Sequence, residues 1–91
     1  IYMPNEITIG NAYPNPFNPV TTLSYEIPSE MHVNLSVYDL AGRQVDELIS
    51  KIHGQGQYEV TWNADKFATG VYMVKLTTGN IVQVQKVILV K

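Results

Sequence analysis

The chain has 91 residues, of which 45% are hydrophobic, and this is enough for one globular domain with a single two-layer core. Its net charge of -2 offers no electrostatic basis for binding nucleic acid or an anionic membrane surface. Cysteine is absent, which excludes a thiolate nucleophile, a disulfide framework and a cysteine zinc site, and no apolar run reaches the ~18–20 residues of a membrane span.

The first part of the chain predicts two strands separated by a stiff segment. Ile7 and Ile9 alternate with polar neighbours and predict a short first strand. Residues 13–19, Tyr-Pro-Asn-Pro-Phe-Asn-Pro, cannot form a helix, because each proline lacks an N–H and restricts the residue before it. The segment is too structured for a linker, and a strand is expected after it over residues 21–27.

The clearest period-2 pattern lies in residues 31–38, where Met31, Val33, Leu35 and Val37 should face the core. Residues 39–42, Asp-Leu-Ala-Gly, predict a type I turn with a glycine bulge, since aspartate can accept from N–H groups inside the turn and glycine can take a positive φ. Residues 43–49 should pair antiparallel with residues 31–38. Their alternation is not strict, which predicts a bulge or an early end.

The second half continues this pattern, with turn residues about every 8–12 positions. A loop is expected over residues 53–56, a strand over 58–62, a connection with one short helical turn over 63–69, a strand over 70–76, a hairpin turn over 77–80 and a last strand over 81–90. The last strand has the densest β-branched content, which favours this assignment. Seven strands result, and they predict an all-β sandwich or barrel.

No catalytic residues, cofactor or metal site are predicted. His32 is expected on the solvent face of a strand and His53 in a glycine-rich loop, both solvated and without metal-ligand spacing. No serine has a nucleophile-elbow context, and the Gly-Gln-Gly of residues 54–56 lacks the helix and lysine of a phosphate loop. A calcium site at Asp65 with backbone carbonyls is left open.

The aromatic residues allow two interpretations. They could form a platform on which sugars stack, or they could supply the large buried areas that a small sandwich needs. The second interpretation is favoured for most of them, including Trp62. Tyr38 is the exception, because its phase in the strand turns it away from the core.

Four segments of the chain resemble one known family. They are residues 13–25, residues 37–45 (Val-Tyr-Asp-Leu-Ala-Gly-Arg-Gln-Val), Trp62-Asn63 with Ala68-Thr-Gly-Val-Tyr72, and the terminal run 86–91. In this order they resemble type A C-terminal sorting domains of cargo proteins of the type IX (Por) secretion system of Bacteroidetes and related bacteria. The immunoglobulin-like domain of flagellar hook-capping proteins is similar. The residues of these motifs that we assign a structural role are Pro14, Asn15, Pro16, Phe17, Asn18, Pro19, Asp39, Gly42 and Trp62.

The resemblance implies a seven-stranded antiparallel immunoglobulin-like β-sandwich at the C-terminus of a larger exported protein. It implies an outer-membrane translocon and a sortase-like peptidase as partners, a surface polysaccharide as attachment point, and a secreted or cell-surface location. The chain begins with Ile1 rather than Met, so we expect a piece of a longer protein that ends at Lys91. Residues 1–12 would be a linker with the first short strand, residues 13–91 the sorting domain, and cleavage would fall in or before residues 1–11.

Recognition is expected in the last hairpin, residues 70–91. An exposed final strand would offer its backbone to a partner strand, while lysines would guard the edge against aggregation. The residues assigned to recognition are Gly70, Tyr72, Lys75, Gly79, Lys86 and Lys91.

Two other functions remain open. An accessory immunoglobulin-like module of a secreted glycoside hydrolase, acting in carbohydrate binding or as a spacer, would carry coplanar exposed aromatics on one sheet face. A structural assembly domain of the hook-cap type would self-associate or bind a filament. An enzyme is not expected, because no acid–base or nucleophile set can be assembled.

Overall fold

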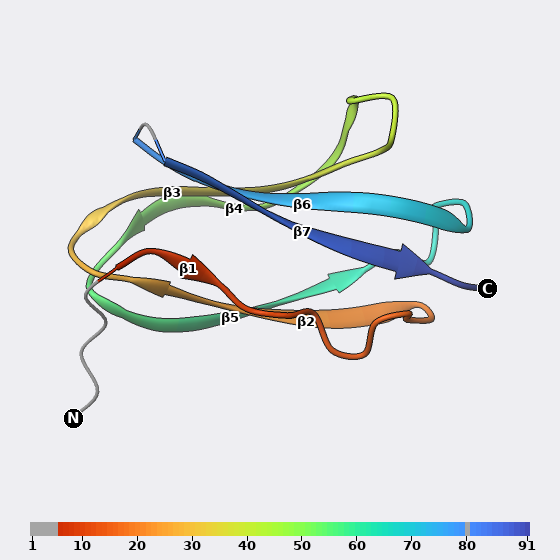
Figure 1. Cartoon of the computed structure of the whole chain (residues 1–91), viewed down its shortest axis with the longest axis horizontal. Helices are drawn as coiled ribbons and strands as arrows, with labels where there is room; N and C mark the ends of the chain where they lie inside the picture. The colour runs from red at the N-terminus through yellow and green to blue at the C-terminus, as the bar shows by residue number, and fades with distance from the viewer. Residues whose placement is uncertain (1–5, 80) are drawn as a thin grey trace.

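The structure, a computed structural model, describes residues 6–79 and 81–91, and shows two antiparallel sheets stacked face to face (Figure 1). The described strands are β1 (Thr8–Ile9), β2 (Val20–Ile27), β3 (Met31–Tyr38), β4 (Gln44–His53), β5 (Gly56–Asn63), β6 (Gly70–Thr78) and β7 (Ile81–Leu89). One sheet has the order β1-β2-β5 and the other β4-β3-β6-β7. The β-sandwich prediction is therefore confirmed. Asn80 of the predicted hairpin turn, and residues 1–5 of the predicted linker, lie outside the described residues.

The core lies between the sheets, where the period-2 pattern places alternate side chains. Val33, Leu35 and Val37 of β3 are fully buried, as predicted, and Met31 is partly buried against them. Strands β2, β6 and β7 contribute in the same way, because every second residue of a strand faces the opposite sheet. The large buried side chains are Phe17, Leu23, Tyr25, Ile27, Val33, Leu35, Val37, Trp62, Tyr72, Val74, Leu76, Val87 and Leu89.

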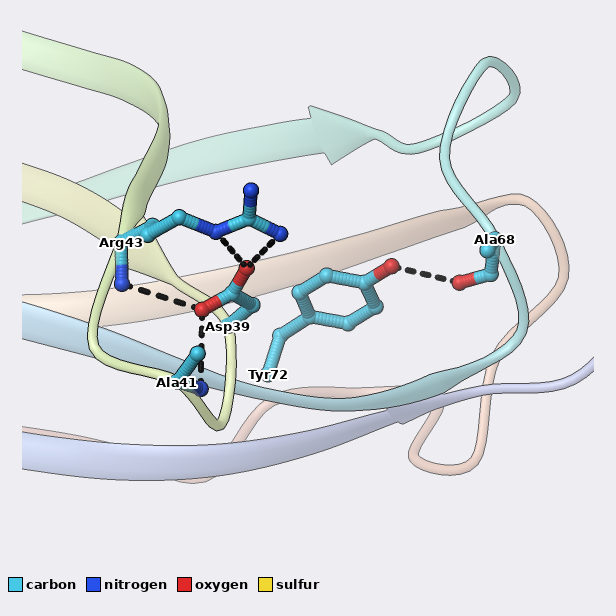
Figure 2. A network of polar contacts seen from close by, with 5 residues as sticks. All are labelled: Asp39, Ala41, Arg43, Ala68 and Tyr72. Atoms are coloured by element: carbon cyan, nitrogen blue, oxygen red, sulfur yellow. Dashed lines mark hydrogen bonds and ion pairs between the residues drawn. The ribbon is translucent and has the colours of Figure 1, made fainter.

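Tyrosines hold two of the corners at which the chain passes from one sheet to the other. Between β4 and β5, the Tyr58 hydroxyl donates to the Gly54 carbonyl at 2.7 Å. Between β5 and β6, the Tyr72 hydroxyl donates to the carbonyl of Ala68, four residues upstream (Figure 2). A tyrosine that bonds back to the backbone a few residues upstream is a feature of immunoglobulin-like sandwiches. The corners therefore agree with the immunoglobulin-like class.

The β3–β4 hairpin contains the predicted irregularity. The pairing register shifts between Leu35 and Ser36, and again between Val37 and Tyr38. These shifts explain why the apolar residues of β4 do not alternate strictly, since each bulge changes the face to which the next residues point. The strand nevertheless continues to His53, four residues beyond the predicted end at residue 49.

The prediction that His53 lies solvated in a loop is wrong. It ends β4 opposite Met31 and is only 7% exposed. Its Nε2 lies 2.8 Å from the Tyr25 hydroxyl, and its ring stacks on Tyr58 with centroids 4.0 Å apart. Burial is the main cause that lowers the pKa of His53, and the positive charge of Lys51 lowers it further. The ring is therefore neutral at pH 7. The two tyrosines come from β2 and β5, so the sequence around His53 does not reveal its environment; His32, in contrast, is exposed as predicted.

The connection between β5 and β6 is a turn rather than a helix. The Phe67 N–H donates to the Ala64 carbonyl at 3.0 Å, which closes one hydrogen-bonded turn. The Phe67 ring is partly buried and lies 5.6 Å from the ring of Trp62. The turn thereby extends the core beyond the last residues of β5.

Candidate functional site

The four motif segments lie at the same end of the sandwich, where the C-terminus emerges (Figure 1). We call this the motif end; it comprises residues 13–19, 39–43, 62–69 and 89–91. The Ala64 N–H donates to the Pro19 carbonyl at 2.8 Å, which joins the first and third segments. The Lys91 ammonium donates to the carbonyl of Asp65, so the fourth segment is tied to the third.

Trp62 is the centre of the motif end. Its ring is 1% exposed, and it lies 5.5 Å from Phe17 and 5.4 Å from Tyr72, measured between centroids. Its Nε1 donates to the Asp46 carboxylate of β4 at 3.0 Å. A buried indole N–H needs such a partner. Trp62 therefore links both sheets to the proline-rich segment.

The proline-rich segment caps the outer edge of β7, which is an edge strand of the four-stranded sheet. The Asn15 carboxamide donates to the Lys86 carbonyl and accepts from the Ile88 N–H, both at 3.0 Å. Phe17 then pairs through its own backbone: its N–H donates to the Ile88 carbonyl, and its carbonyl accepts from the Val90 N–H, both at 2.9 Å. Asn15 and Phe17 thus act as a short parallel strand, in which a side chain supplies the first pair of bonds.

The neighbouring prolines suit this cap. A proline has no N–H, so Pro14 and Pro16 present no donor with which the segment could extend the sheet further. The Pro14 carbonyl accepts from the Thr21 hydroxyl at 2.7 Å, which fixes the segment against the start of β2. The Phe17 ring is 2% exposed, whereas Asn18 lies at the surface. The motif therefore belongs to the fold rather than to a linker.

The Asp39 turn shows the predicted geometry (Figure 2). One Asp39 oxygen accepts from the N–H groups of Ala41 at 2.9 Å and Arg43 at 3.0 Å, and the other meets the Arg43 guanidinium at 3.0 Å. The hydrogen bond from the Arg43 N–H is the main cause that lowers the pKa of Asp39. Gly42 has φ 87°, a conformation that side chains other than glycine adopt only with strain. This turn stabilises the hairpin and leaves no unpaired carboxylate for catalysis.

The outer face of β6 and β7 is cationic and apolar. Lys75 lies over the Tyr38 ring at 4.6 Å from its centroid, and Lys86 is exposed on the next strand. Val82 and Val84, on the same face of β7, are 54% and 44% exposed. Neither β6 nor β7 contains an aspartate or glutamate. This face therefore combines positive charge with exposed β-branched side chains.

Comparison with known proteins identifies the family. Residues 11–91 match the family described as the secretion system C-terminal sorting domain. The chain belongs to this family. Such type IX sorting domains mark proteins for export to the cell surface or for secretion. No curated protein and no solved structure gave a match to this chain.

The structure does not bring the six predicted recognition residues of the sorting domain into one patch. Lys75 and Lys86 share the outer face of β6 and β7, and Gly70 begins β6. Gly79, with φ 55°, lies in the hairpin turn between β6 and β7. The remaining two are Lys91, which lies at the motif end, and Tyr72.

The assignment of Tyr72 to recognition does not suit its position. It is 7% exposed, with its ring against Trp62 and its hydroxyl on the Ala68 carbonyl. A side chain held in this way contributes to the core and is not offered to a partner. The phase of β6 already contains the signal, because Tyr72 alternates with the buried Val74 and Leu76.

Sequence reasoning missed a second contact at the β7 edge. The Gln83 carboxamide accepts from the Ile9 N–H at 2.9 Å and donates to the Ile7 carbonyl at 2.7 Å. It therefore joins β7 to the open edge of β1 in the other sheet. The available signal is a polar residue at an inward phase of the last strand, between Ile81 and Val87.

No cofactor or metal site emerges from this geometry. Within residues 6–79 and 81–91, no three histidine, aspartate or glutamate side chains are grouped to hold a metal ion. At Asp65 the backbone carbonyl already accepts from the Lys91 ammonium, which is a poor neighbour for calcium. The described part of the chain also contains no helix that is long and apolar enough to cross a membrane.

Proposed function

We propose that the sorting domain is a non-catalytic module that takes its parent protein through the type IX pathway and leads to its attachment at the cell surface. The observation that carries this proposal is the family match over residues 11–91. The bonds that join three of the four motif segments at one end support it, because a sorting signal must keep its own fold on any cargo. Most of the motif residues stabilise the sandwich, which leaves recognition to exposed side chains.

We assign recognition to the outer face of β6 and β7. Its charged residues are Lys75 and Lys86. Gly70 is the first residue of β6, and Gly79 lies in the turn that follows this strand. Lys91 is the last residue of the sequence. The partners implied by the family resemblance are the outer-membrane translocon, a sortase-like peptidase and a surface polysaccharide. We keep the division of the chain into a linker with the first short strand, residues 1–12, and the sorting domain, residues 13–91. Cleavage would fall in or before residues 1–11, of which residues 1–5 lie outside the described structure.

The alternative of a carbohydrate-binding module gains no support from the aromatic residues. Among the described residues, Tyr13 is the one exposed aromatic side chain, at 81%. Tyr38 is partly buried beneath Lys75, and the others lie in or against the core. A sugar-stacking platform requires several exposed rings in one plane.

An export assay tests the proposal. Residues 1–91 are fused to the C-terminus of a periplasm-directed fluorescent reporter, in a host with a working type IX translocon and in a translocon mutant. We expect surface appearance only in the first host, with loss of about the 10.2 kDa of the domain if it is removed. A folded reporter that stays intact in the periplasm of both hosts would refute the sorting role.

A matched pair of variants tests the recognition face. Lys75→Ala with Lys86→Ala removes both charges from the outer face of β6 and β7. Lys51→Ala with Lys66→Ala removes two exposed charges elsewhere on the domain. We expect the first pair to reduce export and the second to leave it unchanged, at equal thermal stability. Equal export of both pairs would move recognition away from this face.

A further inference from the structure

The outer edge of β7 is divided into a capped half and an open half. Asn15 and Phe17 pair with the Lys86 carbonyl, with both backbone groups of Ile88 and with the Val90 N–H. The backbone groups that point to the same side in the rest of the strand are those of Val82 and Val84 and the Lys86 N–H. Within residues 6–79 and 81–91, no donor or acceptor bonds to them.

The open half contrasts with the rest of the side of the sandwich formed by the edges of β7 and β1. At the capped half a whole segment shields the strand, and at β1 the Gln83 side chain does so. Exposed β-branched residues beside unpaired backbone groups form a ready template for another strand, and native proteins normally block such sites. The capped half ends at Lys86, so the open half has a defined length and a defined limit.

The charge of this region specifies the partner. β6 and β7 carry Lys75 and Lys86 and no acidic residue, although the whole chain has a net charge of -2. Lys86 forms no ion pair with the residues that the structure describes. A strand laid along the open half would place every second side chain on the outer face, beside Val82, Val84 and Lys86. Apolar residues beside Val82 and Val84 and an acidic residue beside Lys86, at every second position of the partner, meet both conditions.

We propose that residues 82–86 bind an extended segment of a component of the export machinery as a fifth strand of the four-stranded sheet, that this segment carries apolar residues beside Val82 and Val84 and an acidic residue beside Lys86, and that the Asn15 cap ends the pairing. The proposal rests on the sorting function and adds to it the mode of contact and the chemistry of the partner. Main-chain bonds provide most of the affinity in this mode, and the side chains provide the specificity. The cap limits the pairing at one end, because a partner strand cannot extend past Lys86.

Backbone hydrogen exchange on the isolated chain tests the first part. The amides of Val82, Val84 and Lys86 should exchange rapidly, and those of Ile88 and Val90 slowly, because only the latter two are bonded. Slow exchange at Val82 and Val84 in a monomer would show that the edge is already covered and would overturn the proposal. A chain that is dimeric, with these amides protected, would identify the partner as a second copy and would also overturn it.

Proline substitution tests the pairing itself. Val84→Pro removes an outward N–H and leaves the bonds to β6 intact, since an edge strand tolerates proline at such a position. Val84→Thr keeps the backbone and serves as the matched control. We expect Val84→Pro to lower translocon-dependent export about tenfold or more, with a thermal midpoint close to that of the control. If Val84→Pro does not fold, Val82→Pro provides the same test at the other open position.

The outcomes separate this proposal from the sorting function. Export of a folded Val84→Pro domain at the level of Val84→Thr would overturn strand pairing, while export of the unaltered domain would still establish sorting. Lys86→Glu should lower export more than Lys86→Gln, because a carboxylate would face the acidic residue of the partner. Equal export of these two variants would overturn the acidic partner segment.

Discussion

Replacing Phe17 by alanine should cost more stability than any other single truncation in the proline-rich segment. The ring is 2% exposed and lies 5.5 Å from the ring of Trp62, so its removal leaves a cavity in the centre of the motif end. Truncation of a buried phenylalanine costs about 3–5 kcal/mol, a large share of the ~5–15 kcal/mol of a typical domain. In a domain of this length, each kcal/mol of lost stability lowers the melting midpoint by about 5 °C. The midpoint should therefore fall by roughly 15–25 °C.

Thermal and urea unfolding, followed by circular dichroism and by the fluorescence of Trp62, measure this effect. Tyr13→Ala is the matched control, since Tyr13 belongs to the same segment but is 81% exposed and bonds to Thr22 through its backbone. We expect the control to change the free energy of unfolding by less than about 0.5 kcal/mol. Equal losses in the two variants would contradict our reasoning, because they would mean that the segment is a tether outside the core.

Two further predictions concern the Asp39 turn and the buried histidine. Gly42→Ala should destabilise the domain by about 1–2 kcal/mol in urea unfolding, because Gly42 has φ 87°. Gly54→Ala is the control and should cost less, because φ is not positive at Gly54 and no atom lies within 4 Å of an added Cβ. The reverse order of the two losses would be inconsistent with a strained turn. Burial lowers the pKa of His53 from its ordinary 6.5. As the pH falls, the unfolded chain therefore takes up the proton before the folded chain does. Stability should fall as the pH drops below about 6.5, until the pKa of the folded state is passed. His53→Gln should flatten the stability profile between about pH 5 and 7, and parallel profiles of the two proteins would show that His53 does not titrate in this way.

The sequence by itself determined the local structure of this protein. Period-2 alternation located the strands and the core face of β3, since the pleat of a strand turns every second side chain to the same side. The Asp39 turn could be predicted in detail, because all of its bonds lie within residues 39–43. The order of the four motif segments was enough to indicate the sorting-domain family.

Only the tertiary structure decided which residues complete the fold and which stay available to a partner. Asn15 meets the Lys86 carbonyl 71 positions further along the chain, and Gln83 meets Ile7 across 76 positions. The neighbours of His53 likewise come from β2 and β5, and Tyr72 could be assigned to recognition only while its contact with Trp62 was unknown. Periodicity describes the faces of a strand, whereas the bonds at its edges depend on which distant segment lies beside it, and this depends on the topology of the two sheets.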